Sequence, residues 1–368
     1  MAASTERLSG TFWLLFRYDV CEEIRLEQLR AILGAQPAGR EPSFRRPTPE
    51  YVRFEKPPVV EYLDPLLLES RERLLAEMHY YEYGVVSIEL QLPFEFDWPE
   101  LMRLASRSIA APEIEKQAVD SVRRRLARAR PALVKPYTDW LTEDYYIIHV
   151  RPIVKSDGTR VTAAELIGER GAEIAQVVRG EEMRLADDEW REILQARRSY
   201  YPDDLVVIGW TAALIYDTPE GALPVMQLLE YANTQLIEFR YYDEMLTRLL
   251  AGVYRLLDKG TRGLARWRLA REAGRLNAIR LDVRELTERM DNSIKFLSDM
   301  YSARVYRLAA GKVGVTDYRQ LVDEKLRTAG DLYQFMVDQF QQGRAFVLEL
   351  MVVVILVIEL VFLFEGKM

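Results

Sequence analysis

The sequence predicts an α+β fold in three successive parts: a mixed α/β domain over residues 1–222, an antiparallel helical coiled-coil stalk over 223–344 and one C-terminal transmembrane helix over 345–364, followed by a short tail, 365–368. Segments of strand and helix character are interspersed throughout the first part. Proline is absent after Pro224, where apolar residues begin to recur at alternating spacings of three and four. The chain then ends in a long apolar run.

Composition narrows the classes of function. The chain has 368 residues, of which 49% are hydrophobic, so most of it can bury a globular core. Its formal net charge of −7 argues against a general nucleic-acid binder, and no specific nucleic acid is expected as a partner. The single cysteine, Cys21, excludes an intrachain disulfide and suits a reducing compartment. Arg17 and Asp19 end the first apolar run too early for a signal peptide, so the first domain is expected in the cytoplasm.

The N-terminal domain begins with a predicted strand over residues 11–18, TFWLLFRY. Asp19 is placed as the N-cap of the helix that follows, and Gly34 as its C-terminal stop. The clearest strand is 85–96, VVSIELQLPFEF, in which apolar and polar residues alternate. Pro93 removes a ladder hydrogen bond there, which predicts an edge position or a strand end.

Further strands and helices complete this domain. Runs rich in β-branched and aromatic residues predict strands around residues 51–55, 144–154 and 205–217. Apolar periodicity predicts helices over roughly 113–130, 162–178 and 187–197. These elements do not fix a topology.

The stalk is predicted from a coiled-coil seam that Asp243 interrupts. The other seam positions of the first helix are Leu229, Ala232, Leu236, Phe239, Leu246, Leu250, Val253 and Leu257. A break at 259–263 should fold a second helix back against the first, which brings Arg280, or else Asn277 or Arg275, opposite Asp243. We expect Asp243 and Arg280, with Asn277 beside them, to form a structural clamp that fixes register. The alternative is a catalytic role for the same residues.

The last stalk helix has the most regular seam, which indicates self-association. Gly311 and Gly314 separate this helix from the second one. Its seam positions are Val322, Leu326, Ala329, Tyr333, Met336, Phe340, Gly343 and Val347. Because the stripe continues without a break into the apolar terminus, we expect a homo-oligomer assembled through it.

The terminal segment 345–364 is predicted to cross a membrane. Sixteen of its residues are Leu, Ile, Val or Phe, and its length matches the roughly 30 Å of hydrocarbon in a bilayer. Those residues favour insertion by roughly 5–10 kcal/mol, which exceeds the cost of about 3 kcal/mol for the central carboxylate of Glu359. Glu349 lies nearer the polar side, and Glu359 is expected to pair, to be protonated or to face a pore. The prediction is a tail anchor in the inner membrane; the alternative is a helix buried in a soluble oligomer.

No catalytic, cofactor or metal motif is found in the sequence. GKVGVTD lacks the order of a P-loop. The chain has two histidines, His79 and His149, and Glu77 and Glu82 flank the first of them at a spacing that matches no known metal site. We therefore expect an ordinary imidazole at His79, and neither enzyme activity nor a cofactor.

A basic segment in the helix predicted at 113–130 is the other charged feature. Its arginines are Arg123, Arg124, Arg125, Arg128 and Arg130. They would spread around the helix and face solvent, paired with nearby acids. The alternative is contact with anionic lipid or RNA phosphate.

The order of the second half resembles the required-for-meiotic-nuclear-division family, whose members are membrane-anchored and carry a domain of unknown function. The resemblance rests on the run Leu276, Asn277, Arg280, Leu281, Asp282 and Val283, and on Leu348-Glu349 and Ile358-Glu359 in the terminal span. It covers residues 224–364 and implies a membrane-attached, oligomeric organiser without catalytic activity. Because the chain lacks a transit sequence, the resemblance implies a bacterial relative.

Two functional hypotheses follow. The first is a membrane-anchored oligomeric scaffold that presents the α/β domain on the stalk. Its partners would be the lipid bilayer, further copies of the chain and an unidentified protein bound by the α/β domain. The alternative is an oligomeric ion channel or transporter with a pore of C-terminal helices around Glu359.

Overall fold

A computed structural model of the chain describes residues 7–34, 58–67, 72–109, 111–258, 274–275, 278–281, 283–284 and 300–365. The chain forms two compact units. The first consists of Met1–Tyr241 and Glu288–Tyr318, and the second of Tyr242–Thr287 and Arg319–Met368. The strand expected at 51–55 and most of the second stalk helix lie outside the described residues.

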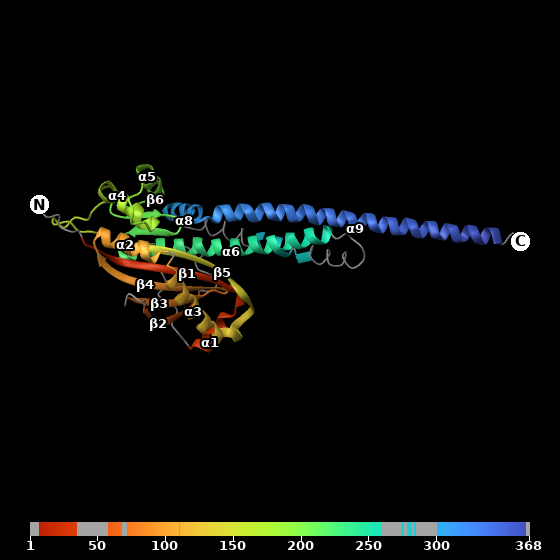
Figure 1. Ribbon diagram of the computed structural model, residues 1–368, viewed down its shortest axis with the longest axis horizontal. Helices are drawn as coiled ribbons and strands as arrows, with labels where there is room; N and C mark the ends of the chain where they lie inside the picture. Colours follow the sequence, from red (N-terminus) through yellow and green to blue (C-terminus); the bar gives the residue numbers. More distant parts are fainter. Residues whose placement is uncertain are drawn as a thin grey trace. The chain divides into compact units, whose positions relative to one another are not determined.

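Among the described residues, the first unit is built on an eight-stranded sheet (Figure 1). Its strands, in spatial order, are β2 (Val59–Leu67), β3 (Arg73–Tyr80), β4 (Val85–Phe96), β1 (Leu8–Ile24), β5 (Leu133–Val150), β8 (Ala212–Tyr216), β7 (Leu205–Ile208) and β6 (Arg197–Arg198). Neighbouring strands run antiparallel, except that β5 and β8 run parallel.

The central strands bury both of their faces. In β4, Val86, Ile88 and Leu90 point into the main hydrophobic core. Ser87 and Glu89 alternate with them, point to the opposite face and are buried as well. The sheet therefore separates an apolar layer from a layer that contains buried polar groups.

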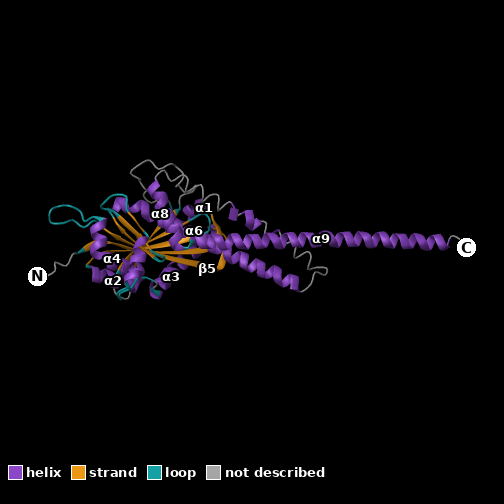
Figure 2. Ribbon diagram, turned by 90° about the horizontal axis from the view of Figure 1, so that it is seen from above, coloured by secondary structure: helices purple, strands orange, loops and turns teal. Residues whose placement is uncertain are grey.

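Helices cover the apolar face of the sheet. They are α1 (Leu26–Leu33), α2 (Trp98–Ser108), α3 (Pro112–Ala129), α4 (Ala163–Arg179) and α5 (Asp187–Gln195). Figure 2 shows α2 and α3 on one side of the sheet, and α8 (Met300–Val313) with the start of α6 (Pro219–Asp258) on the other. Capping boxes begin α2, with Asp97 and Glu100, and α4, with Thr162 and Glu165.

Two long helices extend into the second unit. α6 contains Pro224 and begins at Pro219, slightly before the stalk predicted from residue 223. α8 ends at Gly314, whose φ of 94° suits glycine, and α9 (Val315–Glu365) begins immediately after it. The predicted break at Gly314 is therefore confirmed, whereas Gly311 lies inside α8.

Several local predictions are confirmed. The strand at 85–96 is β4, and the three helices of the first domain correspond to α3, α4 and α5. Gly34 is the C-cap of α1. Pro93 lies at an edge position, because β3 pairs with β4 only as far as Gln91.

Two local predictions are wrong. Asp19 is not an N-cap, because β1 continues through it to Ile24 and pairs it with both Val85 and Leu141. The ladder on two sides outweighs the local capping preference. The segment 205–217 is not one strand but the hairpin of β7 and β8, closed by a hydrogen bond from the Gly209 amide to the carbonyl of Ala212 at 2.8 Å.

The predicted transmembrane helix is also wrong. Among the described residues, no helix is both long and apolar enough to cross a membrane. The predicted span of 345–364 includes two carboxylates, Glu349 and Glu359, which interrupt its apolar sequence. The fold class is therefore mixed α/β with long helices, and the tail anchor and single-pass location are not supported.

Substituting Gly84 tests the tight turn between β3 and β4. Gly84 has a φ of +89°, and an added Cβ would lie 1.8 Å from the Cys21 carbonyl oxygen. We expect Gly84→Ala to lower the free energy of unfolding by about 3 kcal/mol or more, since backbone strain and a clash add. Urea unfolding measures this loss.

Gly34→Ala is the matched control. Gly34 has a φ of +85° but no atom within 4 Å of the added Cβ, so only backbone strain of about 1 kcal/mol is expected. Equal losses at the two glycines would contradict the packing described for this turn.

Candidate functional site

The face of the sheet opposite the main core carries a row of polar residues on four neighbouring strands. His79 on β3 lies opposite Ser87 on β4, and Ser87 lies opposite Arg17 on β1. Arg17 in turn lies opposite Glu143 on β5. We call these four residues the polar row. Arg17 and Ser87 are completely buried, so the row lies inside the first unit.

The first part of α6 covers the polar row. The hydroxyl of Tyr81 donates to Glu230, and the guanidinium of Arg240 forms an ion pair with Glu143. Between these two contacts, Ile237 packs into a small apolar cluster with Tyr81. Positions 230, 237 and 240 lie on one face of a helix. This face of α6 therefore covers the polar row.

One histidine and two carboxylates meet at the β3 end of the row. The ligand atoms of His79, Glu89 and Glu230 all lie within 4.8 Å of one another. His79 Nδ1 is 3.5 Å from Glu89 Oε1, and His79 Nε2 is 3.7 Å from Glu77 Oε2. Gln91 Nε2 donates to Glu77 Oε1 at 3.0 Å. His79, Glu89 and Glu230 are the described residues whose donor atoms could hold a metal ion.

The electrostatics of this cluster favour shared protons when no cation is bound. Burial raises the pKa of Glu89 to about 7, although the charge of His79 opposes the rise. Burial disfavours the imidazolium of His79, but the charges of Glu89, Glu77 and Glu230 outweigh burial and raise its pKa to about 9. The cluster thus contains more negative charge than its cations neutralise.

Arg17 is a buried cation within the polar row. Among the described residues none accepts a hydrogen bond from its Nε, Nη1 or Nη2, and all three atoms are shielded from solvent. Burial raises the pKa of Glu143, and the charges of Arg240 and Arg17 oppose that rise. Because an unpaired buried donor costs about 1–3 kcal/mol, the site around Arg17 is not a closed ion-pair network.

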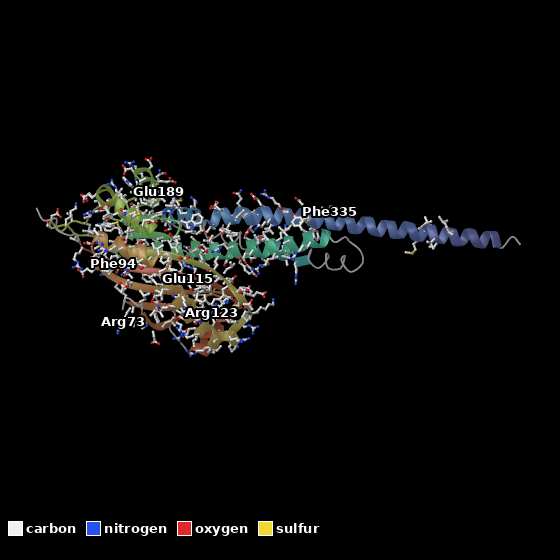
Figure 3. All side chains as sticks on the ribbon, in the orientation of Figure 1. Arg73, Phe94, Glu115, Arg123, Glu189 and Phe335 are labelled. Carbon is white, nitrogen blue, oxygen red and sulfur yellow. The ribbon has the colours of Figure 1, made fainter. Side chains whose placement is uncertain are left out.

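The predicted basic segment lies on α3 and the 3-10 turn Arg130–Ala132. Arg125 donates to Glu61 at 2.8 Å, and Arg124 donates to Ser121 at 3.0 Å. Arg123 stacks over the ring of Trp140 at 5.6 Å and extends from α3 (Figure 3). Arg128 and Arg130 are exposed. The sequence predicts that these arginines face solvent and pair with nearby acids. Arg125 forms such a pair, with Glu61.

The second unit gives the predicted clamp residue Asp243 a different partner. Lys325 Nζ on α9 donates to Asp243 Oδ1 at 2.5 Å and to Thr247 Oγ1 at 2.6 Å. Arg280 is exposed, and Asn277 lies outside the described residues. The half-buried acid on the seam thus pairs α6 with α9 within the described part of the chain. The clamp of Asp243 with Arg280 and Asn277 stays a prediction.

Of the predicted oligomer seam, the positions with described side chains are buried at the beginning and exposed at Tyr333. Val322 and Ala329 are buried, Leu326 is half-buried and Tyr333 is exposed. The side chains of Met336, Phe340, Gly343, Val347, Glu349 and Glu359 lie outside the described residues, although α9 runs through all of these positions.

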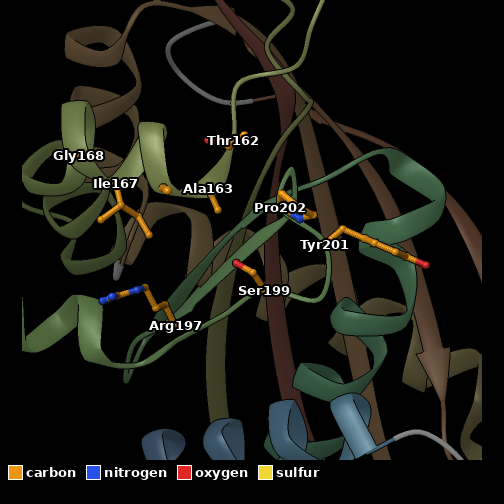
Figure 4. A pocket seen from close by; sticks show the side chains of 9 residues that line it. Thr162, Ala163, Ile167, Gly168, Arg197, Ser199, Tyr201 and Pro202 are labelled. Carbon is orange, nitrogen blue, oxygen red and sulfur yellow. The ribbon is translucent and has the colours of Figure 1, made fainter.

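A cavity of about 660 Å³ lies on the apolar side of the first unit, between the start of α4, β6 and the loop after it (Figure 4). Two of the polar side chains that line it have partners within the chain, and its lining includes no His, Cys, Asp or Glu. Thr162 caps α4, and Arg197 Nη1 donates to the carbonyl of Leu194 at 2.7 Å. The cavity therefore brings together no nucleophile and base.

Sequence reasoning saw two members of the cluster and missed their connection. His79 was considered with Glu77 and Glu82, its neighbours in sequence. Glu89 is one of the polar residues that alternate along the strand at 85–96, which predicts exposure to solvent, but it is buried. His79 and Glu89 could have been linked because polar residues alternate along both of the strands that carry them. The register between these two strands, however, cannot be deduced from the sequence of either one.

Asp19 provides a test of burial on this face. Burial raises its pKa from 3.8 to about 7, so between these pH values the folded chain holds a proton that the unfolded chain releases. The free energy of unfolding should therefore fall as pH rises through this window, by up to about 4 kcal/mol. Asp19→Asn is expected to stabilise the protein above pH 7 and to leave it unchanged below pH 3.8. Urea unfolding across pH measures the difference; parallel pH profiles would refute it.

A double-mutant cycle tests the Asp243 contact. The side chains of Asp243 and Lys325 are 19% and 28% exposed, so Asp243→Asn and Lys325→Gln should show a coupling of about 1 kcal/mol in unfolding free energy. The same cycle with Arg280→Gln should show almost none. Stronger coupling of Asp243 to Arg280 would restore the clamp predicted from sequence.

Comparison with known proteins places the first unit in a family. A curated relative, an uncharacterised protein (MJ0711) of Methanocaldococcus jannaschii, is 20% identical over 195 residues, which cover 53% of this chain and 60% of the relative. No solved structure matches the chain. Neither finding names the required-for-meiotic-nuclear-division family, so that resemblance stays a prediction. The model of the N-terminal domain of uncharacterised protein MJ0711 matches residues 9–222, more than half of the chain, and the chain therefore belongs to that family.

Proposed function

We propose that this protein is a self-associating structural protein, in which α9 packs against further copies of the chain and the α/β unit serves as the binding module. The observation that carries the proposal is the apolar surface near the end of α9. No residue of the chain is assigned a catalytic role. The family assignment supplies no activity, since the matched relative is itself uncharacterised.

The seam on α9 changes character along the helix. At its start, Val322 and Ala329 are buried and Lys325 is bound to Asp243 of α6. Further along, Tyr333 and Phe335 are exposed (Figure 3). α6 ends at Asp258, whereas α9 continues to Glu365. Among the seam positions with described side chains, the first ones are therefore covered and Tyr333 is exposed.

Residues 351–357 are the strongest evidence for a partner. All seven are Met, Val, Ile or Leu, and each is 48–57% exposed. Seven consecutive positions surround the whole circumference of a helix, and a helix that is apolar all round is normally buried. This surface supports the proposal that protein covers it.

Further copies of the chain are the partner that fits best. The surface is aliphatic and uncharged over 351–357, so it offers no charge pattern by which a different protein would be selected. Identical helices present the same surface to one another, and closed symmetric assemblies reuse one patch on each subunit. The seam spacing upstream of these residues is that of a coiled coil. A pore around Glu359 would require membrane-spanning helices, and none is found among the described residues.

Light scattering of the purified full-length chain tests the proposal. We expect a discrete homo-oligomer whose mass does not depend on moderate dilution. Val354→Asp combined with Val357→Asp should shift the mass toward the monomer, because burying a valine stabilises by about 1.5 kcal/mol and an unpaired carboxylate in the same place is costly.

Leu321→Glu is the control, since Leu321 is 44% exposed on the same helix and lies off the seam. This variant should keep the mass of the wild type. A monomer at all concentrations, or an aggregate without a defined mass that both variants leave unchanged, would contradict self-association through α9.

A further inference from the structure

We propose that His79, Glu89 and Glu230 bind one divalent transition-metal ion, such as Zn²⁺, which links strands β3 and β4 to helix α6. The proposal concerns the first unit and does not depend on self-association through α9. Its failure and that of the proposed function are therefore separate results.

The spacing of the ligand atoms suits such an ion. A metal bound about 2.1 Å from each ligand requires ligand atoms about 3–4 Å apart. The separation of 3.5 Å between His79 Nδ1 and Glu89 Oε1 falls in this range. The full set spreads over no more than 4.8 Å, so small side-chain rotations close it. One imidazole with two carboxylates is a donor set for Zn²⁺, Mn²⁺ or Fe²⁺.

The charges of the buried cluster leave room for one divalent cation. Glu77, Glu89 and Glu230 carry three negative charges when ionised, and the guanidinium of Arg17 supplies one positive charge. Because metal ligands must be deprotonated, a bound ion displaces the protons of His79 and Glu89. The charge of −2 that then remains equals that of one divalent ion in magnitude. Glu143 already pairs with Arg240 and does not enter this balance. Unbalanced charge in a buried site is strongly unfavourable.

The polar atoms of the cluster are incompletely bonded. His79 Nε2 is shielded from solvent and has no hydrogen-bond partner among the described residues. Its contact with Glu77 at 3.7 Å is too long for a hydrogen bond. A fully formed ion-pair network would have bonded this imidazole on both sides, so the hydrogen bonding of His79 is incomplete.

The fold provides rigid supports for the three ligands. His79 and Glu89 stand on adjacent antiparallel strands, and Glu230 is held by the hydroxyl of Tyr81. Gln91 orients the neighbouring Glu77. Ligands on secondary structure with further hydrogen bonds around them are typical of built metal sites. A metal ion here would fasten α6 onto the sheet.

Zinc titration of the full-length, untagged chain tests the proposal. Protein stripped with EDTA and dialysed against Zn²⁺ should bind one equivalent, and its melting temperature should rise with zinc concentration because the ion binds the folded state. Glu89→Gln and Glu230→Gln should each weaken zinc binding by about tenfold or more.

Glu82→Gln is the matched control, because Glu82 follows the same strand but is not part of the cluster. It should bind zinc like the wild type. Melting curves in EDTA establish that each variant is folded. Because two ligands are substituted separately, one variant still tests the proposal if the other does not fold. No stoichiometric zinc in the wild type, or affinity unchanged in both ligand variants, would overturn the proposal and leave a histidine held between carboxylates as an ion-pair network.

Discussion

Burial of a charged sheet face beneath one helix is the constraint on which this fold depends. The polar row lies on the central strands, where Arg17 is completely buried and the side chain of Glu143 is 15% exposed. Removing charges from water costs several kcal/mol for each ion unless partners compensate. α6 brings those partners, with Arg240 at one end of the covered face and Glu230 at the other. The order of charges along α6 therefore matches the order of charges across the sheet.

The same helix continues into the second unit, which makes α6 common to both. In the first unit it closes the polar face, and in the second Asp243 binds Lys325 of α9. Each unit thus uses a buried or half-buried ion pair to fix the register of this helix rather than to add much stability. Apolar packing supplies the stability elsewhere, in the core between the sheet and α2, α3 and α4. The two proposals divide in the same way, with a metal ion proposed for the first unit and self-association proposed for the second.

Local patterns predicted the elements whose environment is simple. β4 was found because its two faces alternate, and α3 and α4 because their apolar stripes pack on one core. Asp19 was misplaced because a capping preference is local, whereas the pairing of β1 on both sides is not. The cluster could not be assembled from sequence, since Glu230 lies far from His79 along the chain and joins it only through the packing of α6. The membrane prediction failed because it counted a span across Glu349 and Glu359, and no helix among the described residues is long and apolar enough to cross a bilayer.

Diffraction from zinc-soaked crystals, recorded at the zinc absorption edge, tests the central claim most directly. The claim is that the sheet face under α6 is a polar site that Glu230 completes. It predicts one anomalous peak enclosed by His79, Glu89 and Glu230, with α6 seated over the polar row. Zinc bound elsewhere, or carboxylates of the cluster closed onto Arg17 and His79 without a peak between them, would contradict it.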